Sequence, residues 1–396
     1  MRLLLLASIF IFSLLAWQLD VKIDVDRSQV IFDKDQRVLS IELTKDDKFR
    51  YWRPLSEIAE KYKKFVIEKE DKYFYYHPGV NPVSLSSTTI DYILGQKDRG
   101  GASTITMQLA RLYYNMNTRS PWGKFKQVIA AFWLEFRMTK DSIFESYLNL
   151  IPMGRNIEGF ETASLYYFRK KGANLSRDQF RFLTLLPQRP YLLGSFLAQK
   201  WDDFKVGWEI LYPSLNFEES RQLLEGIELN LERPFYAPHF TRRIIAENSD
   251  KTIQSTLDLG WQRNLESILK NYIKSQEKRG IYNATSLVID NDSGEVRSYI
   301  GSADFDNIQI HGQVDGLMAD RSPGSTLKPF IYALSFQQGL YHPKSIVYDS
   351  PLPYRTPENY DRTYRGPITI ESALITSRNI PAVYVNNELQ QLGQGL

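Results

Sequence analysis

The sequence predicts a multidomain protein with an N-terminal apolar segment, a mainly helical domain and a second domain of mixed α and β structure. Its 396 residues exceed what one hydrophobic core usually organises. Apolar residues recur at helical spacing from about 52 to 200, whereas strand-like alternation and turn signals follow residue 251. We therefore divide the chain into an anchor at 1–20, a short β pedestal at 21–50, a helical domain at 51–200, a linker at 201–250 and a mixed domain at 251–396.

Composition excludes several classes of protein. The net charge of +3 is too small to indicate a nucleic-acid partner. There are no cysteines, so disulfides and thiolate metal sites are excluded, and the four histidines show no metal-ligand spacing. The segment from Arg99 to Lys140 nevertheless holds seven Lys or Arg and one Glu, which fits a phosphate-bearing ligand or anionic lipid headgroups.

The N-terminal segment is apolar from Leu3 to Trp17. It is short for a bilayer span, which needs roughly 17 to 25 residues, and no small-x-small cleavage site follows it. We expect an uncleaved anchor. Arg2 precedes it and Asp20 follows it, so a single-pass protein of the cytoplasmic membrane is predicted, with its bulk on the periplasmic or extracellular side.

Two patterns define the next elements. Residues 21–48 alternate apolar and polar, which predicts a strand pair joined at Asp33–Gln36. The segment that starts at Lys124 has its apolar residues at helical spacing, which predicts one buried stripe with Lys124 and Gln127 on another face. The stripe consists of Phe125, Val128, Ile129, Phe132, Trp133 and Phe136.

The linker and the mixed domain are predicted from turn signals. Arg233-Pro234 and Ala237-Pro238 interrupt a weak periodicity, as in a linker. A strand at Thr252–Asp258 precedes a helix from Trp261 to about Glu277. The apolar runs 286–290 and 295–301 flank a turn sequence, which indicates a hairpin.

Two glycine-punctuated motifs carry the first chemical signal. Residues 70–79 read EDxxFxxHxG, and residues 100–108 read GGxSTxTxQ. They resemble the first two signatures of the family 51 glycosyltransferases, which polymerise the glycan strands of bacterial peptidoglycan. The resemblance continues through residues 142–149 and the turn at 186–190. It implies a lysozyme-like, mainly α fold.

Inverting sugar transfer needs a carboxylate to take a proton from the attacking hydroxyl and cations or a metal to stabilise a pyrophosphate leaving group. The resemblance implies that Glu70 is this base and deprotonates the 4-hydroxyl of the incoming lipid-linked disaccharide. It implies lipid II and the growing glycan strand as ligands. The substrate-binding residues carried over are Asp71, Phe74, His77, Ser103, Thr104, Gln108, Arg111, Lys124 and Gln127.

One departure from the family concerns a divalent cation, Mg²⁺ or Mn²⁺. The family's third motif reads RKxxE, whereas this chain has Gly123-Lys124-Phe125-Lys126-Gln127. The acidic residue that helps to hold the metal or the pyrophosphate is thus neutral Gln127, which brings no charge to a cation. We expect weak metal dependence, with Glu70 still the base and Glu135 a structural residue.

A serine acyl-transfer motif follows in the mixed domain. Three SxxK matches occur, and those at Ser267 and Ser275 lie within an amphipathic helix, as surface residues do. The third, Ser325 to Lys328, follows a Pro-Gly turn that places the serine at a helix start, where free N–H groups stabilise an oxyanion. Lys328 lies one turn later as a base.

An SxN element, Ser377 to Asn379, supplies a second piece of a penicillin-recognising site. With the runs RSPGSTLKPF, APHF and HGQVDG, the chain resembles the class A penicillin-binding proteins, and most of all their 1C type. The resemblance implies Ser325 as nucleophile, Lys328 as base, and Ser377 with Asn379 as proton relay and substrate contact. Peptide stems and β-lactams are the implied ligands.

The third element of such a site, a K[ST]G strand, is absent from the 396 residues. The nearest match, Lys251-Thr252-Ile253, precedes the serine and lacks the glycine. We therefore expect an incomplete α+β transpeptidase domain, either as a fragment or as a naturally short protein.

The sequence leaves three functional hypotheses. The first is a membrane-anchored peptidoglycan glycosyltransferase with a partial transpeptidase domain. A second is a non-catalytic, membrane-tethered scaffold that binds lipid-linked precursor or other cell-wall synthesis proteins, which Gln127 and the missing strand motif favour. A third is a lytic glycosidase, which would need neither a lipid cleft nor an SxxK module.

Overall fold

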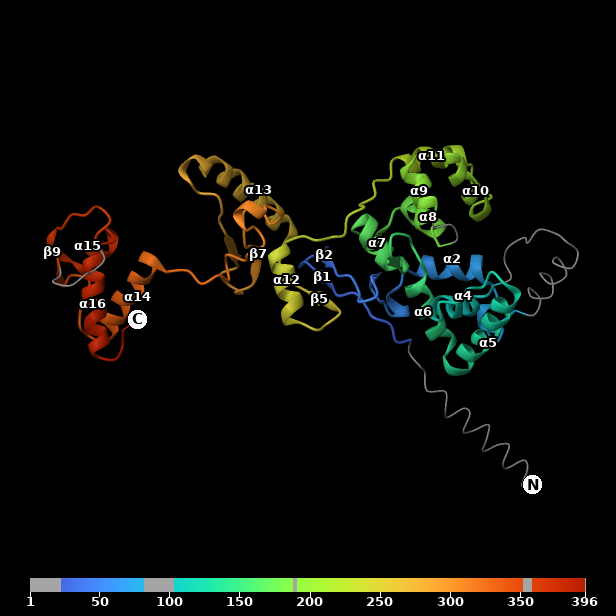
Figure 1. Ribbon diagram of the computed structural model, residues 1–396, viewed down its shortest axis with the longest axis horizontal. Helices are drawn as coiled ribbons and strands as arrows, with labels where there is room; N and C mark the ends of the chain where they lie inside the picture. Colours follow the sequence, from blue (N-terminus) through green and yellow to red (C-terminus); the bar gives the residue numbers. More distant parts are fainter. Residues whose placement is uncertain (1–22, 82–102, 188–190, 352–357, 396) are drawn as a thin grey trace, which may run out of the picture. The chain divides into compact units, whose positions relative to one another are not determined.

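The computed structural model describes residues 23–81, 103–187, 191–351 and 358–395 (Figure 1). The chain divides into two compact units, Met1–Leu317 and Met318–Leu396, and each is described by itself. The predicted anchor at 1–20 lies outside the described residues. Within those described, each helix is too short or too polar to cross a bilayer.

A three-stranded sheet with the order β2-β1-β5 opens the first unit. Strand β1 (Val30–Phe32) pairs antiparallel with β2 (Val38–Ile41), as the alternating sequence predicts. Buried Asp33 holds the turn between them, because it accepts hydrogen bonds from the N–H and Nε of Arg37 at 2.8 and 2.7 Å. The third strand, β5 (Thr252–Gln254), pairs parallel with β1. The predicted start of the mixed domain at 251 therefore lies within one continuous sheet.

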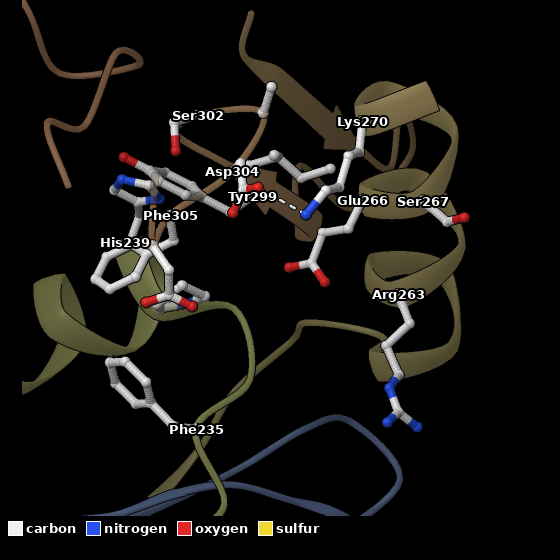
Figure 2. A pocket seen from close by; sticks show the side chains of 14 residues that line it. Phe235, His239, Arg263, Glu266, Ser267, Lys270, Tyr299, Ser302, Asp304 and Phe305 are labelled. Carbon is white, nitrogen blue, oxygen red and sulfur yellow. Dashed lines mark hydrogen bonds and ion pairs between the residues drawn. The ribbon is translucent and has the colours of Figure 1, made fainter. Parts of the chain in front are cut away.

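The chain continues from β5 into the helix and hairpin that the sequence predicts. Helix α13 (Leu259–Gln276) packs on the antiparallel strands β6 (Ser286–Ile289) and β7 (Val296–Ile300). Gln262 fixes this contact, since its Oε1 accepts hydrogen bonds from Ser298 Oγ and the Tyr299 N–H at 2.9 and 2.8 Å. A cavity of about 480 Å³ lies beside α13 and β7 (Figure 2).

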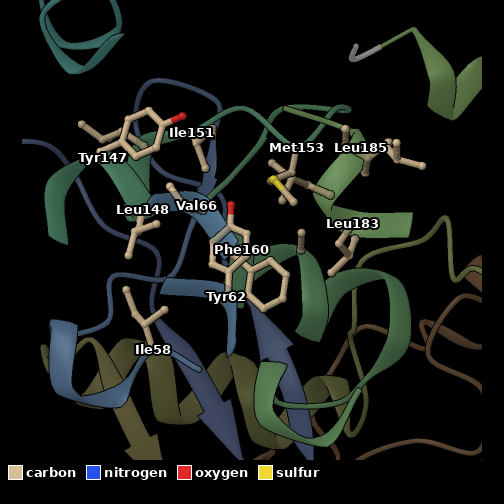
Figure 3. Close-up of a cluster of buried hydrophobic side chains, with 14 of the residues drawn as sticks. Ile58, Tyr62, Val66, Tyr147, Leu148, Ile151, Met153, Phe160, Leu183 and Leu185 are labelled. Atoms are coloured by element: carbon tan, nitrogen blue, oxygen red, sulfur yellow. The ribbon is translucent and has the colours of Figure 1, made fainter. Parts of the chain in front are cut away.

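Helices between residues 60 and 225 enclose the main hydrophobic core of the first unit. At its centre Tyr62 stacks on Phe160, with ring centroids 3.8 Å apart and planes inclined by 14° (Figure 3). The mainly helical character predicted for 51–200 is confirmed. Its helices are α2 (Glu60–Glu70), α4 (Ile105–Tyr113), α5 (Pro121–Arg137), α6 (Lys140–Leu150), α7 (Phe160–Phe168), α8 (Arg177–Leu185) and α9 (Leu192–Leu197).

Truncation of this central ring should strongly destabilise the first unit. Phe160→Ala is expected to lower the free energy of unfolding by about 3–5 kcal/mol, because it leaves a cavity against Tyr62. Phe125→Ala is the matched control, since Phe125 is exposed on α5 and surface truncations usually cost less than about 0.5 kcal/mol. Urea unfolding of both variants measures the difference, and equal losses would contradict the packing described.

The prediction of a linker over 201–250 is wrong for much of its length. Helices α10 (Trp201–Leu211) and α11 (Phe217–Glu225) belong to the main core, where Phe204 and Trp208 are fully buried. Helix α12 (Pro238–Glu247) packs near β7 instead. A proline usually predicts the interruption of a helix, but Pro238 occupies the first turn of α12, where a missing N–H costs little.

The stripe predicted to be buried on α5 is wrong as well. Phe125, Ile129, Phe132 and Trp133 are exposed by about half of their surface. The buried face of α5 instead consists of Gly123, Gln127, Ala131 and Leu134. Small residues allow close approach: a Cβ at Gly123 would lie 2.1 Å from the carbonyl oxygen of Asn117. Helical spacing identifies an apolar face but not what covers it.

The second unit is a small α+β assembly. Helices α14 (Lys328–Gln337), α15 (Ile370–Ile375) and α16 (Asn379–Gln391) pack with the antiparallel strands β8 (Ile346–Asp349) and β9 (Gly366–Thr369). A short 3₁₀ turn, η6 (Gly324–Leu327), leads into α14. The buried side chains that join these elements include Tyr332, Val347, Ile370, Val385 and Leu389.

Candidate active sites

Glu70, the predicted base, is the last residue of α2 and is half-buried. Gln108 on α4 donates from Nε2 to Glu70 Oε2 at 2.9 Å. The Tyr147 hydroxyl on α6 donates to Gln108 Oε1 at 3.2 Å. Burial, followed by the negative charge of Glu70, raises the pKa of Tyr147 well above its usual range, so this hydroxyl keeps its proton. Side chains from three helices thus converge around one carboxylate.

Asp71 and His77 connect the two glycosyltransferase motifs. His77 donates from Nε2 to the Asp71 carboxylate at 2.9 Å, and the Ile105 N–H donates to the same carboxylate at 3.1 Å. Because the carboxylate only accepts hydrogen bonds, His77 carries its proton on Nε2. Asp71 and His77 are both buried. They therefore fix the segment after Glu70 against the start of α4.

Thr104 and Phe74 also act from beneath the site. Thr104 caps α4 by accepting the Met107 N–H at 3.1 Å, and its hydroxyl donates to the Gly79 carbonyl at 2.5 Å. Phe74 is fully buried against Phe144. The structure therefore gives Phe74 and Thr104 buried, supporting positions, whereas the resemblance implies that both are substrate-binding residues, with Phe74 shaping the cleft and Thr104 lining it.

Two of the cationic residues on α4 and α5, Lys124 and Arg111, are predicted substrate-binding residues. Lys124 donates from Nζ to Ser103 Oγ at 2.6 Å, which joins the starts of the two helices. Arg111 is exposed three residues after Gln108, on the same face of α4. Its charge opposes the burial that raises the pKa of Tyr147, so Arg111 acts in the neighbourhood of Glu70. Gly100 to Ala102 of the second motif lie outside the described residues.

Gln127 does not reach a ligand. It is 1% exposed, and its Nε2 donates to the Met107 carbonyl at 2.7 Å. Its Oε1 is buried without a hydrogen-bond partner among the described residues. In the same part of the chain, no three His, Cys, Asp or Glu side chains are grouped to hold a metal ion. Position 127 therefore does not fit the divalent cation that the family pattern implies.

Gln127→Glu is expected to lower the free energy of unfolding by about 1–3 kcal/mol. The change removes a buried donor and turns a carboxylate oxygen towards the Met107 carbonyl. Burial would raise the pKa of the new carboxyl in the folded state, so the loss should appear as pH rises and shrink in acid. Thermal unfolding across pH measures it, with exposed Lys126→Gln on the same helix as control. A variant as stable as the parent at neutral pH would contradict the buried contact.

Glu135, interpreted from sequence as structural, is held by two partners. Its Oε1 accepts the Thr106 hydroxyl at 2.6 Å and the Lys140 ammonium at 2.7 Å. Lys140 also donates to the His77 carbonyl at 2.6 Å. Glu135 thus ties α4, α5 and α6 together.

The second candidate site lies in the second unit, around Lys328. This lysine is buried, and its Nζ donates to the Ser377 carbonyl at 2.6 Å, to Ser377 Oγ at 3.1 Å and to Asn379 Oδ1 at 2.6 Å. Burial, and after it the positive charge of Arg378, lowers the pKa of Lys328. A lowered pKa favours the neutral amine that a general base requires. The structure thus joins three of the four predicted acyl-transfer residues.

Ser325 stands apart from this cluster. It lies in η6 and is exposed, and in the described ranges no hydrogen bond joins its hydroxyl to Lys328. An ammonium has three donors, and all three of Lys328 are directed at Ser377 and Asn379. The predicted nucleophile, Ser325, and the predicted base, Lys328, are therefore near in sequence but are not joined by a hydrogen bond in the described ranges.

The other two SxxK matches behave as surface residues. Lys270 donates to Asp304 at 2.6 Å, and Figure 2 shows the Ser267 hydroxyl pointing away from the Lys270 ammonium. Ser275 donates to the Tyr272 carbonyl within its own helix. Neither serine is activated by its lysine.

Two family models match the chain in sequence order. Residues 35–204 match the model described as transglycosylase, and residues 284–393 match the penicillin-binding protein transpeptidase domain. The first match contains Glu70, and the second contains Ser325 and Lys328. The chain belongs to the class A penicillin-binding proteins.

Named penicillin-binding proteins align along most of the chain. Penicillin-binding protein 1C of Escherichia coli (strain K12) is 33% identical over 96% of this chain and 51% of its own length. Penicillin-binding protein 1F of Bacillus subtilis (strain 168) is 28% identical over 85% of this chain and 50% of its own length. A crystal structure of penicillin-binding protein 1A from Haemophilus influenzae aligns with a TM-score of 0.46 and 14% identity, over 94% of this chain and 64% of that one. The chain spans about half the length of the curated relatives.

Several residues of this penicillin-binding protein support the candidate sites but are not predicted from the sequence. Tyr147 orients Gln108, and the only sequence signal for it is its place within residues 142–149, where the family resemblance continues. Asp349 and Asn359 hold the SxN turn from a distant part of the chain, and no local pattern could reveal them. Arg378, in contrast, is the middle residue of the SxN element, and this position alone indicates that it lies beside the second site.

Proposed function

We propose that this chain polymerises lipid II into glycan strands, with inversion at the sugar and release of undecaprenyl pyrophosphate. The observation that carries the proposal is the placement of Glu70. Its carboxylate ends α2 and is oriented by a neutral amide, Gln108, within a match to the transglycosylase family.

In the proposed reaction, Glu70 accepts the proton of the 4-hydroxyl as that oxygen attacks the anomeric carbon of the neighbouring sugar. The C–O bond to the pyrophosphate breaks as the new glycosidic bond forms, and the electron pair leaves with the pyrophosphate. A positioned general base contributes about 10²–10⁴-fold to such a rate. Gln108 and Tyr147 would hold the carboxylate in line with the hydroxyl.

Cationic side chains are proposed to stabilise the leaving group. Lys124 and Arg111 would face the pyrophosphate oxygens, and Ser103 would orient Lys124. A divalent cation has no fitting ligand at Gln127, and no step is assigned to one. We expect polymerisation to respond little to EDTA, and a complete loss of activity at trace EDTA would contradict this.

The lipid part of the substrate fits the exposed face of α5. Trp122, Phe125, Ile129, Phe132 and Trp133 lie exposed along this helix, and Lys126 and Arg137 lie over the rings of Trp122 and Trp133. Indole rings beside cations suit a membrane interface. We propose that this face meets the bilayer, that residues 1–20 are a single membrane anchor, and that the bulk of the protein lies outside the cytoplasm.

The second unit is proposed to carry part of a serine acyl-transferase that recognises peptide stems and β-lactams. Lys328, Ser377 and Asn379 would supply the base and proton relay, and Ser325 the nucleophile. The proposal rests on the hydrogen bonds at Lys328 and on the transpeptidase match.

Purified protein incubated with lipid II in detergent tests the main function. We expect glycan strands that grow with time and consume lipid II. Binding of lipid II without turnover would replace the proposal with a scaffold function. Cleavage of preformed strands without synthesis would replace it with a lytic glycosidase.

A further inference from the structure

We propose that Arg378 is a positioning residue of the second site, which holds Ser377 and Asn379 on the amine of Lys328. The inference rests on the proposed acyl-transfer function of this unit. Its evidence is a buried network of carboxylates and amides behind the SxN turn.

The guanidinium of Arg378 donates hydrogen bonds to two carboxylates and one backbone carbonyl. Nε donates to Asp349 Oδ2 at 2.7 Å, Nη1 donates to Asp361 Oδ2 at 2.7 Å, and Nη2 donates to the Thr363 carbonyl. Arg378 is 3% exposed and Asp349 is fully buried. Arginine in such a fork has fixed geometry, unlike a lysine, which offers a point charge on a flexible stem.

A second arm of the network reaches Asn379 directly. Asn359 donates from Nδ2 to Asp349 Oδ1 at 2.7 Å, and its Oδ1 accepts the Asn379 N–H at 2.8 Å. Asn379 Nδ2 donates to the Glu358 carbonyl at 2.6 Å, which leaves its Oδ1 for Lys328. Asp349 is thus shared by the residues that fix both sides of the turn.

The turn needs such a clamp because its backbone is strained. Ser377 has a φ of +51°, in the left-handed region, which is unfavourable for a residue with a Cβ. This conformation directs both the carbonyl and the hydroxyl of Ser377 at Lys328 Nζ. If the hydrogen bonds of the Arg378 guanidinium were lost, the turn could leave its left-handed conformation. The Lys328 ammonium would then become accessible to water.

The charges around Lys328 are consistent with this role. After burial, the positive charge of Arg378 lowers the pKa of Lys328, and Asp349 and Asp361 accept hydrogen bonds from the Arg378 guanidinium. The N–H of Thr363, more than Arg378, lowers the pKa of Asp361 to about 2, so this carboxylate stays charged at neutral pH. Burial remains the main reason why the pKa of Lys328 is low, and burial depends on the turn staying in place.

The test is an NMR titration of the Lys328 side chain, followed through its ¹³Cε and ¹⁵Nζ signals in the full chain. Arg378→Gln and Arg378→Lys should both raise the pKa of Lys328, because each removes the fork. Arg362→Gln is the control, because Arg362 is exposed and lies between Asp361 and Thr363. This change should leave the pKa of Lys328 unchanged. If Arg378→Lys keeps the parental pKa while Arg378→Gln raises it, charge alone acts and the positioning role is refuted.

Asn359→Ala keeps the proposal falsifiable if the Arg378 variants do not fold. It removes the acceptor of the Asn379 N–H without changing any charge, and should also raise the pKa of Lys328. A parental pKa in a folded Asn359→Ala protein would overturn the proposal. The titration uses no acyl donor, so its result does not depend on acylation. If the chain extended by the K[ST]G strand of a relative failed to react with penicillin, that result would count against the acyl-transfer function and leave the titration readable.

Discussion

Glu70→Gln is expected to abolish glycan polymerisation, with a loss of about 10²–10⁴-fold in rate. The glutamine preserves the shape of the side chain and can still bond to Gln108, so the fold should remain intact. What disappears is the carboxylate predicted to take the proton, and the other motif positions offer no ready substitute, because Asp71 is buried against His77 and position 127 is a buried amide. The measurement is turnover of lipid II by the two purified proteins at equal concentration.

Glu68→Gln provides a matched control for this experiment. Glu68 lies on the same helix and is exposed, and its substitution by Gln removes the same charge as Glu70→Gln. It should retain parental activity. Polymerisation at the parental rate by Glu70→Gln would show that the base has been misassigned, whatever the control does.

A fluorescent penicillin is expected to label the 396-residue chain weakly or not at all. The Lys328 donors are directed at Ser377 and Asn379, and Ser325 is exposed without a hydrogen bond to the lysine in the described ranges. The sequence also lacks the K[ST]G strand, which contributes to the oxyanion donors and to the clamp on the substrate carboxylate. Each missing donor costs about 10²–10³-fold.

Fusion of the chain to the missing strands of a relative should restore labelling. Ser325→Ala should remove the restored signal, whereas Ser267→Ala should leave it, because Ser267 is turned away from its lysine. Strong, Ser325-dependent labelling of the unextended chain would refute the prediction and show that these 396 residues contain a working site.

Local patterns predicted the elements better than their burial. The strand pair at β1 and β2, helix α13 and the β6–β7 hairpin follow from alternation, spacing and turn residues. The apolar face of α5 was assigned to the core because spacing does not report what a face contacts. Weak periodicity and two later prolines predict a linker where helices α10 and α11 lie, because neither signal reports the burial of Phe204 and Trp208.

The sites show the same division between local and distant information. In the structure Glu70 contacts Gln108, and Lys328 contacts Ser377 and Asn379, while the catalytic roles that the motifs assign to them stay predictions. The motifs did not separate residues that face a ligand from residues such as Phe74 and Gln127, which are buried beneath it. That distinction depends on packing between helices, which a single sequence does not contain.

The parallel pairing of β1 with β5 has a consequence for the order of folding. Ser255, next to β5, donates its hydroxyl to the Phe32 carbonyl at the end of β1 across a sequence separation of 223 residues. During synthesis, β1 therefore leaves the ribosome long before its parallel partner exists. Contacts of such high sequence separation form slowly, because the intervening chain must be ordered first. The helices between them should fold as an independent unit, and the sheet should close only afterwards. Until it closes, the edge of β1 is open to pairing with other chains.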